Sequence, residues 1–310
     1  MMLWTETYRP LVIDDVVLPA ALKDQFKQAI NSNNIQNMLF TGTGGIGKTT
    51  VAKIICKALK MDYLFINGSE ESGIDVLRTK IKHFASTVSL SGGIKVVIID
   101  EADYLNAQST QPALRAFMEE FHKNCRFILT CNYKDRIIPE LHSRCAVFDF
   151  NITKADRPAL ATQIFRRIKF ILENENVTIE DDKVVAELIT RYIPDWRRVI
   201  NELQRYSASG IIDKGILHDL SDDSVSKLIK YLKEKNFKAM RSWVSENADM
   251  GAEALYRKIF DNMSLYAVPN STPTIVLILA EYQYKAAFVA DVELNTVACL
   301  TELMSGVEWK

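Results

Sequence analysis

The sequence predicts an α/β domain built on a parallel sheet, followed by two smaller all-α domains. Short apolar segments alternate with segments of helical spacing from residue 1 to about 150, and this alternation is typical of a buried parallel sheet covered by helices. No strands are expected after about residue 151. A chain of 310 residues suits two or three domains, and we place them at 1–152, 153–215 and 216–310.

The expected strands of the first domain are short and mostly apolar. They are Met38–Thr41, Tyr63–Asn67, Lys95–Asp100, Arg126–Thr130 and Ala146–Phe150. Two of the segments between them, Thr49–Leu59 and Gln111–Phe121, repeat apolar residues with the spacing of a helix. Strands and helices therefore alternate along the first domain.

The rest of the chain has helical spacing only. Apolar residues share one expected helix face within residues 155–208: Ile164, Ile168, Ile171 and Leu172. A loop containing Gly210 and Gly215 follows, and in residues 222–310 Leu228, Tyr231 and Leu232 again share a face. The third domain is also rich in aromatic residues, which we interpret mainly as core: Tyr256, Phe260, Tyr266, Tyr282, Tyr284 and Phe288.

Composition excludes several classes of protein. Hydrophobic residues make up 48% and charged residues 25% of the chain, which is ordinary for a folded globular protein and unlike a disordered one. The net charge of −1 gives no global signature of nucleic-acid binding. No apolar run is long enough to span a bilayer and no secretory signal is visible, so we expect no membrane partner. Five scattered cysteines without a CxxC pair suggest neither zinc nor disulfides, and hence a reducing cytoplasm.

A phosphate-binding loop follows the first expected strand. Residues Gly42–Thr49 fit the pattern G-x-x-x-x-G-K-[ST] and open a helix, which is the context that the motif requires. Its glycines let backbone N–H groups turn toward phosphate oxygens, and the helix N-terminus adds partial positive charge. Lys48 would reach the β- and γ-phosphates, and Thr49 would hold Mg²⁺ through its hydroxyl. A plain glycine-rich turn is the alternative interpretation.

Two carboxylates follow the aliphatic run Val96–Ile99. Ligands bind at the C-terminal ends of strands in open α/β sheets, so Asp100 would hold the metal, directly or through water, and Glu101 would polarise the attacking water as general base. The alternative for such a pair is an ordinary turn at a strand end. Asn132, at the end of the next expected strand, could hydrogen-bond the γ-phosphate or the water.

Several motifs together resemble one family of ATPases. The string Glu101-Ala102-Asp103 after four aliphatic residues, then Asn132, then Ser143-Arg144-Cys145, is similar to the AAA+ ATPases of the sliding-clamp-loader family. The opening segment Trp4–Pro10 looks like that family's Trp-x-x-Lys-Tyr-Arg-Pro element, and the segment Pro194–Arg198 looks like its second sensor. These motifs extend over about two thirds of the chain. Within the family, the chain looks most like the large subunits of T-even-like bacteriophage clamp loaders.

The resemblance implies a P-loop ATPase domain, a helical lid and a C-terminal all-α collar. It also implies roles by position. The adenine pocket would be lined by Thr5, Glu6, Thr7, Tyr8 and Val17, and the phosphates would be wrapped by Gly45, Ile46, Gly47, Lys48, Thr49 and Thr50. Asn132 would be the first sensor, and Arg197 on the lid would touch the γ-phosphate. Arg144 would be an arginine finger that acts on the ATP of a neighbouring subunit. Thr7 stands where the family usually has Lys.

A basic cluster provides a candidate DNA surface. Arg78 and Lys82 are four residues apart on an expected helix and share a face, and backbone N–H groups near Gly73 and Ile74 lie at the start of that helix. A solvated helix face is the alternative interpretation. The resemblance implies that several subunits surround primer–template DNA and recognise its backbone shape.

The leading hypothesis is an ATPase that loads a ring-shaped sliding clamp onto primer–template DNA. ATP and Mg²⁺ are the expected ligands, and the resemblance implies four partners: the clamp, a clamp-loader small subunit, further copies of the chain and DNA. ATP binding would open the clamp, and DNA-triggered hydrolysis would release it. Another AAA+ DNA motor, such as a branch-migration helicase, and a non-hydrolysing ATP-binding scaffold are the alternatives. A GTPase is disfavoured because no N-K-x-D string is present.

Overall fold

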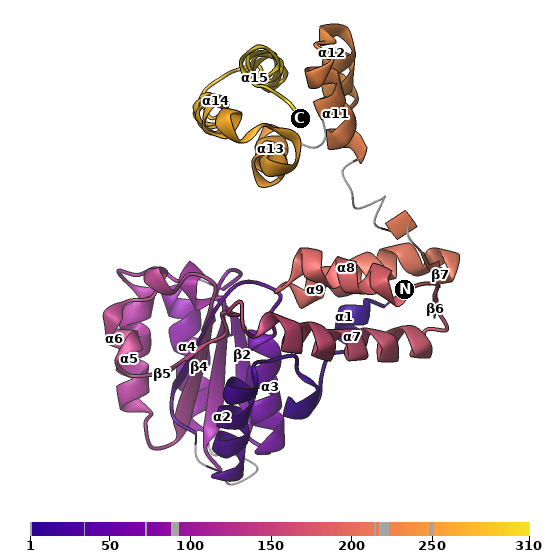
Figure 1. Cartoon of the computed structure of the whole chain (residues 1–310). Helices are drawn as coiled ribbons and strands as arrows, with labels where there is room; N and C mark the ends of the chain where they lie inside the picture. The colour runs from indigo at the N-terminus through magenta and orange to yellow at the C-terminus, as the bar shows by residue number, and fades with distance from the viewer. Residues whose placement is uncertain are drawn as a thin grey trace. The chain divides into compact units, whose positions relative to one another are not determined.

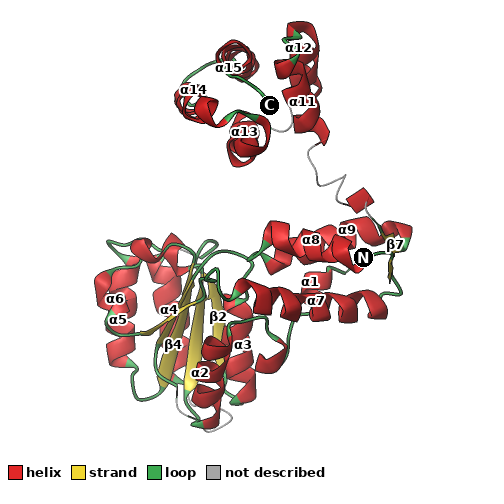
Figure 2. Cartoon of the chain, in the orientation of Figure 1, coloured by secondary structure: helices red, strands yellow, loops and turns green. Residues whose placement is uncertain are grey.

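The computed structural model describes residues 2–33, 35–71, 73–87, 93–213, 215–216, 223–247 and 251–310. The chain forms two compact units, residues 1–214 and residues 215–310, and each is described by itself (Figures 1 and 2). The expected division of the first unit at residue 152 stays a prediction.

A five-stranded parallel sheet forms the centre of the first unit. Its order is β2-β3-β4-β1-β5, and every neighbouring pair is parallel. The strands are β1 (Met38–Thr41), β2 (Tyr63–Asn67), β3 (Lys95–Asp100), β4 (Cys125–Cys131) and β5 (Ala146–Asp149). The first three have the expected bounds. Strand β4 is one residue longer than expected at each end, and β5 ends one residue earlier than expected. Because β1 lies between β4 and β5, the loop after β1 lies beside the end of β4.

Helices cover both faces of this sheet, as an all-parallel sheet requires. The helical elements of this part are α1 (Trp4–Thr7), η1 (Ile13–Asp15), α2 (Ala20–Asn31), α3 (Lys48–Ala58), α4 (Ile74–Ser86), η2 (Ala102–Tyr104), α5 (Thr110–Glu120), η3 (Lys134–Arg136) and α6 (Pro139–His142). Helices α2 and α3 share a core with Phe40, and α4, α5 and α6 share the opposite core with Leu39 (Figure 1). Successive residues of β1 thus point to opposite faces.

The remainder of the first unit is helical with one small addition. Helices α7 (Arg157–Asn174), α8 (Asp182–Tyr192) and α9 (Trp196–Tyr206) bury the expected stripe of Ile164, Ile168, Ile171 and Leu172. The expectation that strands stop at residue 151 is wrong in detail, because β6 (Thr178–Ile179) and β7 (Ile211–Ile212) form a two-stranded parallel sheet next to η4 (Ser207–Ser209). A two-residue strand is too short to show the alternation that identifies strands in a sequence.

Hydrogen bonds hold the N-terminal segment against helix α9. Trp4 is buried, and its backbone N–H donates to Gln204 Oε1 on α9 over 2.9 Å. The Gln204 amide in turn donates to the carbonyl of Met2 over 2.9 Å. Residues far apart in the sequence therefore hold the start of the chain against α9.

The second unit is all helical among its described residues, as expected. It consists of α11 (Asp223–Lys233), α12 (Phe237–Glu246), α13 (Ala252–Tyr266), η6 (Pro269–Ser271), α14 (Thr272–Ala286) and α15 (Val292–Gly306). Leu228, Leu232 and Tyr256 lie in its core, and Tyr231, Tyr266 and Tyr282 pack against that core. The interpretation as core is wrong for three aromatic residues, which are exposed: Phe260, Tyr284 and Phe288.

Two further properties concern the side chains and the length of the helices. All five cysteines are free thiols. None of the helices in the described ranges combines the length and the apolar character that crossing a membrane requires.

The buried position of Leu39 gives a stability prediction. Leu39 is fully buried in β1, whereas Leu11 is 67% exposed. We expect Leu39→Ala to lower the free energy of unfolding by about 2–5 kcal/mol, because it removes packed methyl groups and leaves a cavity. Leu11→Ala is the matched control and should change this free energy by no more than about 0.5 kcal/mol. Urea titration of both variants measures the difference, and equal losses would contradict the assignment of the core.

Candidate functional site

A cavity of about 310 Å³ lies at the C-terminal ends of β1, β3 and β4 and reaches helices α7 and α9. It is lined by the phosphate-loop residues 44–50, by strand-end residues, by the N-terminal segment and by side chains of the two helices. This edge of a parallel sheet is where open α/β folds bind ligands. The sheet order therefore brings the motifs predicted from distant parts of the sequence into one site.

The phosphate loop has the backbone geometry that its glycines allow. Gly45 and Gly47 have φ values of +75° and +104°, which L-residues with side chains rarely adopt. Helix α3 begins at Lys48, directly after Gly47. A Cβ added to Gly45 would lie 1.9 Å from Asp195 Oδ1, so glycine is required where α9 approaches the loop.

Lys48 connects this loop to the end of β4. Its side chain is 7% exposed, and Nζ donates to the carbonyl oxygens of Gly42 and Thr43 over 2.6 and 2.8 Å. A third bond of 2.8 Å runs to Asn132 Oδ1. Burial lowers the pKa of Lys48. Among the described residues, the hydrogen-bond partners of this ammonium are all neutral, so it is well suited to bind an anion.

The predicted metal-binding pair lies together. Asp100 Oδ1 accepts hydrogen bonds from Thr49 Oγ1 over 2.7 Å and from Thr130 Oγ1 over 2.5 Å. Mg²⁺ typically takes one or two protein oxygens and completes its shell with phosphate and water. The described residues contain no group of three or more His, Cys, Asp or Glu side chains that could hold a metal by themselves. The oxygen pair of Thr49 and Asp100 therefore fits an Mg²⁺ ion that is shared with a bound phosphate.

Glu101 has an unusual backbone conformation. Its φ and ψ are 55° and 44°, in the left-handed region that costs a non-glycine residue free energy and that clusters at functional sites. Its backbone N–H donates to Thr130 Oγ1 over 3.2 Å. The Thr130 hydroxyl thus contacts both acidic residues. The sequence did not predict Thr130 as a residue of the site, although a hydroxyl near the end of an apolar strand indicates a polar side chain at the ligand-binding edge of the sheet.

Asp103 is a second residue for which the sequence predicted no function. Its carboxylate is buried, with the residue 5% exposed. Oδ2 accepts from the backbone N–H groups of Asn132 and Tyr133 over 3.2 and 3.1 Å. Asp103 therefore fixes the turn that carries Asn132. Its position three residues after Asp100 was the sequence feature that could have indicated a place in the site.

The N-terminal segment also lines the cavity. Thr5, Glu6, Tyr8 and Val17 contribute to the lining. Thr7 does not: it is exposed, and its hydroxyl donates to the carbonyl of Leu3 over 3.2 Å. The Thr7 side chain therefore contributes nothing to the cavity wall.

Helix α7 and the residue that follows it, Glu175, hold Tyr8 at two points. The Tyr8 hydroxyl donates to Glu175 Oε1 over 2.6 Å, and this hydrogen bond raises the pKa of Tyr8. Arg167, which was not predicted from the sequence, lines the cavity and donates to the backbone carbonyl of Tyr8 over 2.9 Å. The N-terminal segment and the lid helix therefore form one wall of the cavity.

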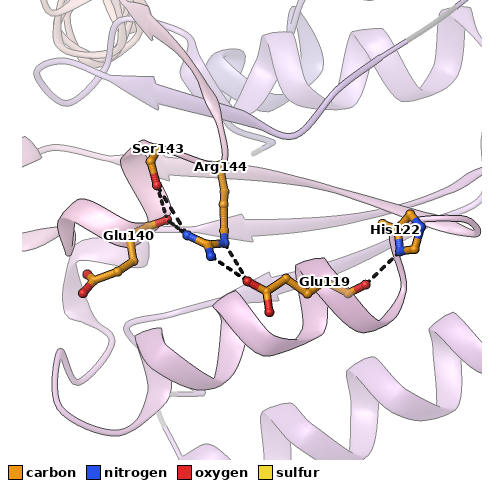
Figure 3. Close-up of polar contacts among 5 residues, drawn as sticks. All are labelled: Glu119, His122, Glu140, Ser143 and Arg144. Atoms are coloured by element: carbon orange, nitrogen blue, oxygen red, sulfur yellow. Dashed lines mark hydrogen bonds and ion pairs between the residues drawn. The ribbon is translucent and has the colours of Figure 1, made fainter.

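The two predicted arginines occupy different places. Arg197 comes from α9 and lines the cavity. The first turn of that helix is capped by the Asp195 carboxylate, which accepts from the Arg198 N–H over 3.0 Å. Arg144 lies outside the cavity wall and is exposed, with its guanidinium bonded to Glu119 (Figure 3). The structure thus brings Arg197, but not Arg144, to the site of its own chain.

The four DNA candidates lie on α4 or directly before it, and outside the cavity wall. Gly73 precedes the helix, Ile74 begins it, and Arg78 and Lys82 are exposed along it. Arg78 Nη1 lies 3.8 Å from Asp75 Oδ1, and an exposed pair of this kind contributes little free energy. These positions are open to a ligand outside the cavity.

Comparison with known proteins provides independent findings. Residues 38–152 match the family model of the ATPase family associated with various cellular activities (AAA). Residues 156–218 match the model of the sliding-clamp-loader large subunit, AAA+ ATPase lid domain. The second match covers most of the helical part of the first unit.

Similar proteins extend over nearly the whole chain. The sliding-clamp-loader large subunits of Escherichia phage RB69 and Enterobacteria phage T4 are each 34% identical over 309 residues, covering 98% of this chain and 96% of theirs. A replication factor C small subunit of Archaeoglobus fulgidus is 37% identical over 77% of this chain and 76% of its own. A solved RuvB structure from Thermotoga maritima aligns with a TM-score of 0.56 at 16% identity, over 83% of this chain and 88% of its own. That likeness shows the fold alone.

The close approach of Asp195 to Gly45 gives a testable prediction. Gly45→Ala should lower the free energy of unfolding of the chain by roughly 1–3 kcal/mol, because it combines a left-handed φ with displacement of a helix cap. Gly44→Ala is the control in the same loop, since its added Cβ would meet nothing within 4 Å. It should change this free energy by about 0.5 kcal/mol or less. Denaturant titration without nucleotide measures both, and equal effects would contradict the prediction.

Proposed function

The chain belongs to the sliding-clamp-loader large-subunit family of AAA ATPases, and on that premise we propose that it uses ATP to load a ring-shaped sliding clamp onto primer–template DNA. The observation that carries the proposal is the convergence of Lys48, Asp100, Glu101, Asn132 and Arg197 on one cavity. Several fixed polar groups directed at one phosphate are what phosphoryl transfer requires, because its catalysis is mostly positioning and electrostatics.

Within the cavity, Lys48 and the backbone of residues 45–50 would hold the phosphates of ATP. The ammonium would exchange its neutral partners for anionic oxygens, which form stronger hydrogen bonds. Thr49 and Asp100 would hold Mg²⁺, which supplies positive charge next to the phosphates when bound. The end of the cavity near Tyr8 and Val17 would receive the adenine.

Glu101 would be the general base for the attacking water. It directly follows the metal-binding aspartate at the end of β3, and its backbone is held by Thr130. Asn132, fixed by Asp103, would hydrogen-bond the γ-phosphate or the water. Arg197 would add charge from α9, so that closure of the lid helices completes the site.

The position of Arg144 supports a multisubunit enzyme. Because this side chain is exposed and does not line its own cavity, it would act as an arginine finger on ATP bound by a neighbouring copy. Hydrolysis would then depend on an assembly of several copies with a clamp-loader small subunit. The exposed Leu277, Tyr284 and Phe288 of the second unit are candidates for the collar contacts in that assembly.

The alternatives have weaker support. A branch-migration helicase rests on a likeness to RuvB at 16% identity, which concerns the fold and not the activity. A non-hydrolysing scaffold would need none of the catalytic set around Asp100 and Glu101, and this chain has all of it.

A mixing experiment tests whether ATP is hydrolysed between subunits. Lys48→Ala destroys the ATP site but leaves a finger, whereas Arg144→Ala destroys the finger but leaves an ATP site. In the assembly with the small subunit, we expect each variant alone to lose roughly 10³-fold or more of the hydrolysis rate. A mixture of the two should recover part of it, because some interfaces then contain an intact site and an intact finger. If the mixture stays inactive while both variants still assemble, a finger supplied in trans is contradicted.

Glu101→Gln separates a hydrolysing enzyme from a scaffold. Loss of the general base should reduce the rate of ATP hydrolysis by roughly 10²- to 10⁴-fold and leave the affinity for ATP unchanged, because the phosphate-binding groups remain. A nucleotide-binding titration and a steady-state ATPase assay of the assembly measure both. A wild-type assembly that binds ATP without hydrolysing it would support the scaffold instead.

The basic face of α4 gives a test for DNA contact. Changing both Arg78 and Lys82 to Ala should lower DNA-stimulated hydrolysis and reduce the slope of log affinity against log salt by about 1 for each DNA phosphate that the variant no longer neutralises. The matched control is the double change Lys238→Ala and Arg241→Ala, which removes two exposed charges from α12. Equal behaviour of the two double variants would remove α4 from the DNA-binding surface.

A further inference from the structure

The guanidinium of Arg144 is held by its own chain. Nε and Nη2 both donate to Glu119 Oε1, over 3.0 and 2.6 Å. Nη1 donates to the carbonyl oxygen of Glu140 over 3.0 Å and lies 3.4 Å from Ser143 Oγ. Figure 3 shows the guanidinium between the Glu119 carboxylate and the segment that carries Glu140 and Ser143.

These hydrogen bonds use most of the donors of the side chain. A guanidinium has five N–H groups, and the bonds to Glu119, Glu140 and Ser143 leave one N–H of Nη2 without a partner. Bidentate binding of a phosphate needs two N–H groups. Arg144 therefore has to release one of its present partners before it can bind a phosphate in this way.

Among the three partners of the guanidinium, Glu119 is the one that carries a charge. Its carboxylate neutralises Arg144, and a neutralised finger has less electrostatic attraction for the negative charge of a phosphate. An approaching phosphate would also repel the carboxylate. The carbonyl of Glu140 and the hydroxyl of Ser143 are neutral and are not repelled by a phosphate. Phosphate binding therefore opposes the bond to Glu119.

The segments that carry this pair pack on one buried core, whereas the pair itself is exposed. Phe117 of α5 and Leu141 of α6 belong to one buried core, so the distance between the two segments is set by packing. The Arg144 and Glu119 side chains are 33% and 55% exposed, and such ion pairs are weak and screened by salt. The His122 ring nitrogen Nδ1 contacts the backbone carbonyl of Glu119 over 2.8 Å and not its carboxylate (Figure 3).

We propose that Glu119 is a positioning residue that holds the Arg144 finger in a charge-neutralised position until the ATP of a neighbouring subunit displaces the carboxylate. The proposal rests on the proposed function, because it assumes that Arg144 acts in trans. Glu119 would thereby slow hydrolysis in assemblies that have ATP but not DNA. Alignment of the subunits on DNA would supply the phosphate contact that breaks the pair.

Removal of the Glu119 charge tests this. In the assembly with the small subunit and without DNA, Glu119→Gln and Glu119→Ala should each raise the rate of ATP hydrolysis by roughly two- to fivefold, the range expected for loss of an exposed ion pair. Glu140→Gln is the matched control: it removes a neighbouring charge but keeps the backbone carbonyl that binds Arg144. This control should leave the rate unchanged. Higher salt should reduce the difference between wild type and Glu119→Gln, because salt already screens the pair.

The Arg144→Ala background distinguishes the possible failures. In that background, Glu119→Gln should have no effect, since the finger on which it acts is missing; a purely structural role of Glu119 would persist there. If Arg144→Ala alone leaves hydrolysis by the assembly unchanged, Arg144 is not the arginine finger that the proposed function assumes, and this inference is overturned as well. If Arg144→Ala abolishes hydrolysis but Glu119→Gln matches Glu140→Gln or is slower than wild type, the proposed function stands and this inference is overturned.

Discussion

The site depends on one buried cation. Lys48 is nearly inaccessible, and its three partners are two carbonyl oxygens of the preceding loop and the amide oxygen of Asn132. These oxygens take the place of water around the ammonium, and the nearby Asp100 and Asp103 carboxylates favour its charge, but burial still lowers its pKa. The same bonds set the shape of the phosphate loop and fix the distance between the ends of β1 and β4. Hydrogen bonds within the chain therefore hold Lys48 and the loop in place before any phosphate binds.

Around this cation, polar groups are held in place by other polar groups. Thr130 joins Asp100 and Glu101, and Asp103 holds the turn that carries Asn132. Networks of this kind restrict each side chain to one orientation, and pre-organised dipoles stabilise a developing charge without a cost at the moment of reaction. The strained backbone of Glu101 belongs to the same framework, since the surrounding bonds keep it in a conformation that it would otherwise leave.

The site is also distributed over elements that are distant in sequence. The helices α7 and α9 contribute Arg167 and Arg197, and Gly45 allows α9 to approach the loop. Arg144 stays outside, where Glu119 occupies it. If a neighbouring subunit supplies the positive charge of its Arg144, ATP is hydrolysed only in the assembled complex. The weak surface ion pair between Arg144 and Glu119 would then set the rate of hydrolysis before DNA binds.

The residues alone determined much of this protein. Mostly apolar runs of four to six residues identified three strands to the residue, because a parallel sheet covered by helices on both faces selects apolar side chains along most of each strand. The motifs around Lys48 and Asp100 predicted the phosphate-binding and metal-binding groups, because their chemistry depends on residue type and local order, and these residues line one cavity. Only the tertiary structure decided which side chains meet: Thr130 and Asp103 enter the site through strand pairing, and Thr7 leaves it because the short helix α1 turns its side chain to solvent. The pairing of Arg144 with Glu119 could not be predicted from local sequence patterns either, because α5 and α6 come together through a core shared by residues far apart in the sequence.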